Sequence, residues 1–340
     1  MRPNLFNYAT SELSQDAFLA WLFKWAEKEN EKEDKNLHDC AESLLHLFLG
    51  KIDPSEIKTI EISRQWENID LWITINNEYH LIIEDKTGTS EHNNQLIRYK
   101  KIAKDWFDEQ QCQDFDSTFS FVYFKTENIT PYEEERVNKA GWKIFNRVDV
   151  LNVFGKYEIK NDIFLDYKNK IQKKQINQDS VFKLPFEKIL KSKNKNEYIK
   201  GFYSTLVPEL DCAYWKYVNN PSKSFYGMWW YWCEWDFGTL YFQFNEFDLE
   251  IRLNEIKGIK DKKLARNKAY KKIMDVVKES TYKGLIHKPE HFGTGNSMAI
   301  VKIDKSLWLS LDEEGCLDVN TILEKLHNLE DFLWEKVLGN

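Results

Sequence analysis

The chain has 340 residues, of which 42% are hydrophobic and 15% aromatic, and its formal charge at pH 7 is -7. This composition excludes a chain that is disordered over most of its length, and the length favours two domains over one. The acidic balance excludes a protein that binds nucleic acid through bulk positive charge. Any contact with nucleic acid would need local basic patches, a bound metal ion, or both.

The cysteines and the apolar segments indicate the compartment. The five cysteines lie far apart and form no C-x-x-C pair, which argues against a structural zinc site and a disulfide framework: Cys40, Cys112, Cys212, Cys233 and Cys316. We therefore expect reduced thiols and a cytoplasmic protein. No signal peptide is apparent at the N-terminus, and no run of about 18 apolar residues predicts a membrane span.

The first half of the chain alternates between helical and strand-like patterns. Ser11–Ala26 has apolar residues at helical spacing, whereas Ile69–Ile75 alternates cleanly between apolar and polar residues. The predicted elements are, in chain order, Ser11–Ala26, Leu37–Leu49, Lys58–Arg64, Ile69–Ile75, Tyr79–Asp85, Asn93–Phe107, Phe119–Lys125, Pro131–Ala140 and Trp142–Phe145. Helices interleaved with strands in this order predict an α/β domain over residues 1–155.

The composition changes after this domain. Residues 156–200 hold twelve lysines against six acidic residues, which predicts a basic connector or a solvated linking helix. Residues 201–340 are expected to form an α+β domain that binds nucleic acid, dimerises or regulates. Its predicted elements are Phe225–Trp235, Thr239–Phe244, Asp248–Leu253, Lys262–Ser280, Ser297–Ile303 and Asn320–Val337.

The strongest chemical signal lies in the predicted hairpin around Asn76–Glu78. If these three residues form the loop, the facing positions of the two strands are fixed, and Asp70 lies directly opposite Glu84. Lys86, two residues beyond Glu84, lies on the same face. A slip by one residue would put the two carboxylates on opposite faces.

Two carboxylates that face each other on neighbouring strands require an explanation. Their Cβ atoms would be about 5 Å apart, and like charges at that spacing destabilise a sheet. A divalent cation removes the repulsion, and oxygen ligands suit Mg²⁺ or Mn²⁺, which also accept water and a substrate phosphate. The alternative, on this observation alone, is a pair of half-exposed carboxylates with Lys86 as counter-ion.

The motifs around this hairpin resemble a known family. Asp70, then Glu84-Asp85-Lys86, then Gln95 to Tyr99 follow the D…ExK…QxxxY order of the PD-(D/E)XK nuclease superfamily. The acidic first helix resembles that of a bacterial branch. The resemblance covers about residues 10–105 and departs from the name-giving motif at Ile69, where proline would stand. It implies a restriction-endonuclease-like core, with a mixed central sheet flanked by helices, followed by the α+β C-terminal domain.

The resemblance also implies roles for single residues. Those implied for catalysis are Asp70, Glu84, Lys86 and Gln95, and those implied for the metal are Glu12, Asp70, Glu84 and Asp85, the last through its backbone carbonyl. Asp16 shares a helix face with Glu12 and is the second choice for the first-helix acid. Burial would lower the pKa of Lys86 and the carboxylates would raise it again, which argues against Lys86 as a strong base.

The implied function is hydrolysis of phosphodiester bonds with Mg²⁺, for which Mn²⁺ would substitute. DNA is the expected substrate, and a second copy of the chain or a partner from a defence system is a possible further partner. Defence against foreign DNA rests on the resemblance alone. Two alternatives stay open: an effector subunit gated by a partner or ligand, and a catalytically silent nucleic-acid-binding module.

The second half offers weaker signals. Residues 257–272 carry eight basic residues and one acid, which indicates either a phosphate-binding surface or a solvated helix face. The tryptophans from Trp229 to Trp235 favour sheet core over a stacking platform for unpaired bases or a dimer face. His287 and His291 are a doubtful zinc pair because Pro289 lies between them, and Gly293 to Gly295 is expected to be a turn.

Overall fold

The computed structural model of the chain describes residues 3–52, 54, 56–88, 94–110, 114–220, 224–258 and 260–339. They form two compact units that divide between Gln175 and Ile176. Each unit has its own sheet and its own hydrophobic core. The division falls inside helix α7 (Asp162–Asp179), within the stretch that the lysine content predicted to be a connector.

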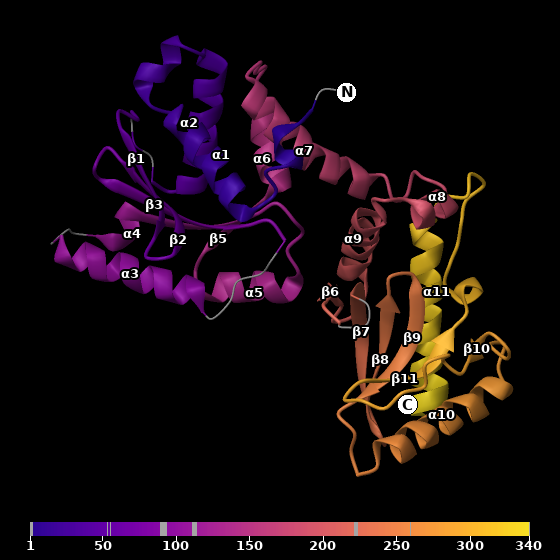
Figure 1. Cartoon of the computed structure of the whole chain (residues 1–340). Coiled ribbons are helices and arrows are strands. Elements are labelled where there is room, and N and C mark those ends of the chain that lie inside the picture. Colours follow the sequence, from indigo (N-terminus) through magenta and orange to yellow (C-terminus); the bar gives the residue numbers. More distant parts are fainter. Residues whose placement is uncertain are drawn as a thin grey trace. The chain divides into compact units, whose positions relative to one another are not determined.

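Unit 1 is built on a mixed sheet of five strands in the order β1-β2-β3-β4-β5 (Figure 1). The first three pair antiparallel, whereas β4 runs parallel to both β3 and β5. Their bounds are β1 Ile60–Trp66, β2 Ile69–Ile75, β3 Tyr79–Lys86, β4 Phe119–Lys125 and β5 Lys143–Asn146. The predicted mixed α/β core is thus confirmed, with every strand close to its expected range.

Helices cover both faces of this sheet, which explains why β4 is buried along its whole length. One face packs against α1, α2, α6 and α7, and the other against α3 and α5. Alternate residues of β2 therefore enter different cores: Ile73 joins the first and Trp72 the second. The helices of unit 1 are α1 Glu12–Lys24, α2 Lys35–Leu49, α3 Gln95–Glu109, α4 Phe115–Thr118, α5 Pro131–Lys139 and α6 Arg147–Phe154, with α7 at its end.

The hairpin of β2 and β3 has the predicted register. Leu71 pairs with Ile83 and Ile75 with Tyr79, so the loop consists of the three residues Asn76 to Glu78. Asn76 and Asn77 have φ of 54° and 56°, in the left-handed region that asparagine tolerates better than most residues. The loop length thus brings the ends of β2 and β3, with Asp70 and Glu84, to the same level of the sheet.

The imidazole of His80 on β3 makes the stability of unit 1 depend on pH. It packs against Trp72, Trp106 and Phe119, and its Nδ1 accepts a hydrogen bond of 3.2 Å from Trp72 Nε1. Burial lowers the pKa of His80 from 6.5 to about 4. The unfolded chain therefore takes up a proton between these pH values that the folded chain does not. We expect the free energy of unfolding to fall by up to about 3 kcal/mol as the pH drops from 6.5 to 4.

Urea unfolding of the full chain at a series of pH values measures this effect. The substitution His80→Phe keeps an aromatic ring in the cluster and removes the titrating group, so its stability should fall less than that of the wild type over the same range. Equal pH dependence in the two proteins would contradict the assignment to His80.

Unit 2 holds a six-stranded antiparallel sheet in the order β10-β11-β9-β8-β7-β6 (Figure 1). Its strands are β6 Tyr214–Val218, β7 Phe225–Trp235, β8 Gly238–Asn245, β9 Asp248–Asn254, β10 Ile286–His287 and β11 Met298–Ile303. Its helices are α8 Phe186–Lys191, α9 Lys195–Leu206, α10 Lys262–Lys278 and α11 Val319–Phe332, which continues as a π-helical segment, η5, over Leu333–Leu338. The α+β character expected after the first domain is confirmed.

The lysine-rich stretch of residues 156–200 is largely helical and takes part in both cores. Phe164 and Tyr167 on α7 are buried in the core of unit 1, and Ile189 on α8 and Ile199 on α9 in that of unit 2. Its apolar positions thus pack while many of its lysines lie at the surface, as Lys173 does.

The tryptophans of β7 lie largely inside, as the sequence favoured: Trp229, Trp230 and Trp235 are buried. Cys40, Cys212, Cys233 and Cys316 are free thiols, and Cys112 lies outside the described residues. Within the described ranges, none of the helices combines the length and apolar character needed to cross a membrane.

Candidate active site at the ends of β2 and β3

Asp70, Glu84 and Lys86 meet where β2 begins and β3 ends. The ammonium of Lys86 contacts Glu84 Oε1 and lies 3.9 Å from Asp70 Oδ2. Asp70 Oδ2 accepts a hydrogen bond of 2.9 Å from the backbone N–H of Asp85, which fixes its carboxylate against the end of β3. The hairpin register therefore gathers the three side chains that the sequence singled out.

Glu84 is fully buried, which decides its electrostatics. Burial, followed by the nearby carboxylate of Asp70, raises the pKa of Glu84 to about 8, although Lys86 acts in the opposite direction. Neither carboxylate oxygen receives a hydrogen bond of regular geometry from the described residues. A buried carboxylate in this condition is costly, so the site favours a cation placed beside it.

The side chain of Lys86 is protonated at neutral pH. Burial by itself lowers the pKa of Lys86, but Glu84, Asp70 and Glu12 outweigh burial and raise it. This is the balance that the sequence suggested. A protonated ammonium is a hydrogen-bond donor and a positive charge, and it is not a general base.

The first helix brings two acids to the same end of β3. Glu12 Oε1 accepts a hydrogen bond of 3.1 Å from the backbone N–H of Thr87, next to Lys86. Asp16 is fully buried, and the amide of Gln65 bridges it to Asp70 at 3.3 and 3.0 Å. The helix thus links Asp16, the second choice from the sequence, to Asp70 through Gln65. The preferred Glu12 binds the backbone beside Lys86 and raises the pKa of that lysine.

The side chain of Asp85 faces away from its neighbours Glu84 and Lys86, because successive residues of a strand point to opposite faces. Gln15 Nε2 donates to Asp85 Oδ1 at 2.5 Å. Burial, followed by the nearby charge of Asp16, raises the pKa of Asp85 well above its ordinary value, and burial raises that of Asp16 to about 6. The Asp85 side chain lies on the other face from Asp70 and Glu84, so any role for Asp85 in binding a metal would fall to its backbone carbonyl.

Gln95 lies in the first turn of α3. Its Nε2 is 3.3 Å from the hydroxyl of Tyr99, and that hydroxyl donates to the backbone carbonyl of Asn68. Tyr99 itself is fully buried. The pair therefore ties α3 to the turn that precedes Asp70, and any contact of Gln95 with substrate stays a prediction.

Sequence reasoning missed a buried ion pair beside the site. Lys125 is the partner of Lys86 across β3 and β4, and its Nζ lies 2.7 Å from both oxygens of Glu133 on α5. Their side chains are 4% and 5% exposed, so neither charge is shared with solvent. Tyr123 adds a hydrogen bond of 2.5 Å to the same carboxylate.

The substitution Lys125→Met should destabilise unit 1 by about 3–5 kcal/mol, because it leaves Glu133 as a buried charge without its cation. Combining it with Glu133→Gln should recover most of the loss, since glutamine still accepts from Tyr123. Urea unfolding of the three proteins tests this. A single variant within about 1 kcal/mol of the wild type would show that the pair is not desolvated in solution.

The donor atoms fit a hard divalent cation. Asp70 and Glu84 offer carboxylate oxygens, which Mg²⁺ and Mn²⁺ prefer, and both oxygens of the buried Glu84 lack regular hydrogen bonds. In the part of the chain that the structure describes, no three His, Cys, Asp or Glu side chains gather closely enough to hold a metal ion alone. Water, substrate and a backbone carbonyl would have to complete the coordination, as is usual for Mg²⁺.

Comparison with known proteins agrees with this geometry. A family model described as the PD-(D/E)XK nuclease superfamily matches residues 3–203, more than half of the chain and well beyond the motifs around the hairpin. A five-stranded mixed sheet flanked by helices is the restriction-endonuclease-like core that the resemblance implied. No curated protein and no solved structure matches the chain.

Proposed function

The chain belongs to the PD-(D/E)XK nuclease superfamily, and on this premise we propose that it is a metal-dependent nuclease with its active site at Asp70, Glu84 and Lys86. The observation that carries the proposal is the fully buried Glu84 carboxylate, which lies beside Asp70 and in contact with Lys86. Such a cluster of like charges costs stability, and a bound catalytic cation would offset the repulsion between the carboxylates.

Asp70 and Glu84 would hold Mg²⁺, with the backbone carbonyl of Asp85 as a further ligand. When bound, the metal would lower the pKa of a coordinated water and offset negative charge in the transition state. Gln65 and the backbone N–H of Asp85 both donate to Asp70, so its carboxylate is held in one orientation before any ligand arrives. This preorganisation is the contribution of the protein.

Lys86 would donate hydrogen bonds to the attacking water or to the phosphate oxygens. Because the carboxylates raise its pKa, it acts as an electrostatic stabiliser and orienting donor. Glu12 binds the N–H of Thr87 and would position the end of β3 rather than touch the phosphate. Gln95 would bind a phosphate oxygen near the scissile bond.

DNA is the substrate that the resemblance implies, and defence against foreign DNA is the role we propose for its cleavage. Incubating the full chain with supercoiled plasmid, single-stranded DNA and RNA, each with Mg²⁺, Mn²⁺ or EDTA, tests this proposal. We expect cleavage of at least one DNA substrate with either metal and none with EDTA. Cleavage that persists in EDTA would contradict metal dependence, and cleavage of RNA alone would overturn the choice of DNA.

A further inference from the structure

The sheet of unit 2 carries a polar pocket on the face that turns away from its core. The pocket has a volume of about 300 Å³, a size typical of small-molecule sites. Gln243, Asn245, Glu250 and Arg252, from β8 and β9, line it together with Phe225 at the start of β7. The apolar residues that alternate with them on β8 and β9 lie in the core.

A connected set of hydrogen bonds holds these side chains in place. Trp229 Nε1 donates to Gln243 Oε1 at 2.7 Å, and the amide of Gln243 donates to Asn245. Asn245 Nδ2 and Arg252 Nη1 both donate to Glu250 Oε2, at 3.1 and 2.7 Å. The second carboxylate oxygen, Oε1, accepts no hydrogen bond from the residues that the structure describes.

The rim of the pocket is the loop from His291 to Ser297, and it is fixed at both ends. The buried Arg266 of α10 stacks 3.7 Å over the ring of Phe292 and donates to the carbonyls of Phe292 and Gly293. At the other end, Arg252 donates to Ser297 through Nε at 3.0 Å and Nη2 at 3.2 Å. Arg266 therefore fixes the rim and does not belong to a solvated basic face.

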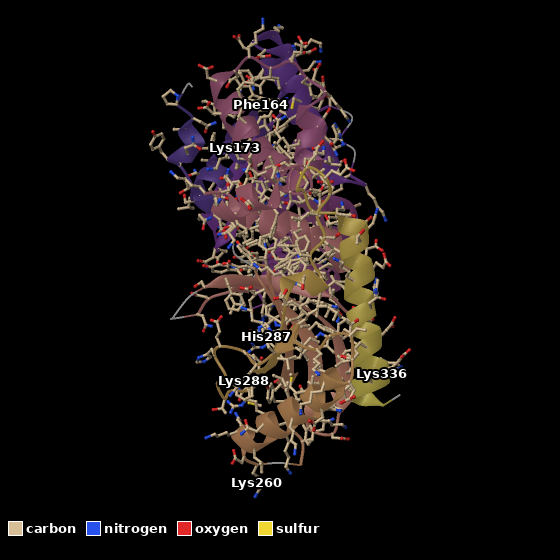
Figure 2. The ribbon with its side chains drawn as sticks, turned by 90° about the vertical axis from the view of Figure 1, so that its right-hand side faces the viewer. Phe164, Lys173, Lys260, His287, Lys288 and Lys336 are labelled. Carbon is tan, nitrogen blue, oxygen red and sulfur yellow. The ribbon has the colours of Figure 1, made fainter. Side chains whose placement is uncertain are left out.

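The loop bears on two interpretations of the sequence. His287 lies on β10 while His291 lines the pocket, so the two histidines do not share a helix. Lys288, beside His287 in Figure 2, lies 4.7 Å over the ring of Phe292. The turn from Gly293 to Gly295 thus forms part of the rim of the pocket.

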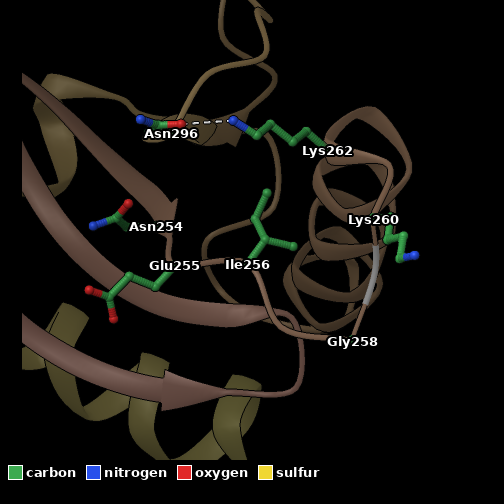
Figure 3. A pocket seen from close by; sticks show the side chains of 7 residues that line it. All are labelled: Asn254, Glu255, Ile256, Gly258, Lys260, Lys262 and Asn296. Atoms are coloured by element: carbon green, nitrogen blue, oxygen red, sulfur yellow. Dashed lines mark hydrogen bonds between the residues drawn. The ribbon is translucent and has the colours of Figure 1, made fainter.

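A second groove, of about 800 Å³, is lined by Lys260 and Lys262 together with Asn254, Glu255, Ile256, Gly258 and Asn296 (Figure 3). Asn254 lies two residues along β9 from Arg252, on the same face. Lys262 Nζ donates to Asn296 at 2.8 Å, next to Ser297, while Lys260 points away from Asn296 (Figure 3). The positive charge of these lysines attracts phosphate groups.

We propose that the pocket binds a nucleobase that carries an exocyclic amino group. Oε1 of Glu250 can accept a further hydrogen bond, which the amino groups of adenine, cytosine and guanine can donate, whereas thymine and uracil carry no such amino group. The carboxamides of Gln243 and Asn245 match the mixed donor and acceptor edge of a base, and Phe225 offers a ring for stacking. The charges of Glu250 and Arg252 pair with each other inside the pocket, so we place the phosphates outside it, beside Lys262.

The base has two possible sources, a free nucleotide or a nucleic-acid strand, and the pocket recognises the same chemistry in both. Binding is measured without cleavage, so the result does not depend on the proposed nuclease activity. We would use the full chain in EDTA and compare oligo(dA) and oligo(dC) with oligo(dT) by fluorescence anisotropy. AMP, CMP and dTMP then compete in a second series.

We expect oligo(dA) or oligo(dC) to bind about 10-fold more tightly than oligo(dT), the worth of one hydrogen bond to a charged group. Glu250→Gln should remove this preference, because the amide can turn its N–H₂ toward the base. Glu313→Gln, the same charge change at an exposed site in unit 2, should keep it. If free AMP or CMP displaces the oligonucleotide, the ligand is a free nucleotide. If neither displaces it, the ligand is a nucleic-acid strand.

A second variant guards against misfolding of the first. A Cβ added at Gly295 would approach Ser297 no closer than 3.4 Å, so Gly295→Leu should fold and obstruct the mouth of the pocket. It should weaken binding of all the oligonucleotides while leaving the thermal transition unchanged. Equal binding of the three oligonucleotides by the wild type would overturn the proposal. So would a preference that survives Glu250→Gln together with undiminished binding by Gly295→Leu.

Discussion

Replacing Glu84 with glutamine should reduce metal-dependent cleavage on the order of 10³-fold or more, because the amide removes a charged metal ligand. The fold should survive. Burial and Asp70 raise the pKa of Glu84 to about 8, so the carboxylate is costly to keep charged, and a neutral isostere removes that cost. Initial cleavage rates, together with a thermal melt in EDTA, measure both effects.

Glu78→Gln is the matched control for this variant. It makes the same charge change in the same hairpin, at an exposed residue of the loop, and should cut DNA at the wild-type rate. A Glu84→Gln protein that retains a tenth or more of the wild-type rate would contradict a role for this carboxylate in holding the metal.

Replacing Lys86 with methionine should separate metal binding from catalysis. Its ammonium contacts Glu84 and lies 3.9 Å from Asp70, so it competes with a cation for the same oxygens. We expect Mn²⁺ to bind Lys86→Met at least as tightly as the wild type, whereas cleavage falls about 10²–10³-fold through loss of the donor. Calorimetry with Mn²⁺ and single-turnover cleavage give the two readouts.

Stability supplies a third readout for the same variant. Without metal, Lys86→Met leaves Asp70 and the buried Glu84 uncompensated, so its melting temperature should fall and then recover when Mn²⁺ is added. Lys173→Met, at an exposed lysine of α7 (Figure 2), is the control. It should change neither the melting temperature without metal nor its response to Mn²⁺. If metal affinity and cleavage both fell together, Lys86 would be a structural residue.

The core of the candidate site could be predicted because its geometry is local. Asp70, Glu84 and Lys86 lie on two strands joined by a three-residue loop, and the apolar alternation fixes their register. The hydrogen bonds that support these residues could not be predicted from the sequence. Gln15 and Asp85 are 70 residues apart, and Asp16 and Gln65 are 49 apart, so those contacts follow from how α1 packs on the sheet.

Residues 156–200 show what the count of charged residues leaves out. Their excess of lysine suggested a connector, yet Phe164, Tyr167 and Ile171 follow a helical spacing and are all buried. That stripe was visible in the sequence. The lysines of the same segment obscured it, because long charged side chains keep their heads in water while the helix beneath them packs.

Metal binding tests the central claim most directly, because it does not depend on a trigger that a gated nuclease would need. Mn²⁺ titrations of the full chain, followed by electron paramagnetic resonance, would compare the wild type with Asp70→Asn, Glu84→Gln and the exposed control Glu78→Gln. We expect a saturable site in the wild type and the control that weakens about 10-fold or more in both site variants. Equal Mn²⁺ binding by all four proteins would contradict a metal site at Asp70 and Glu84.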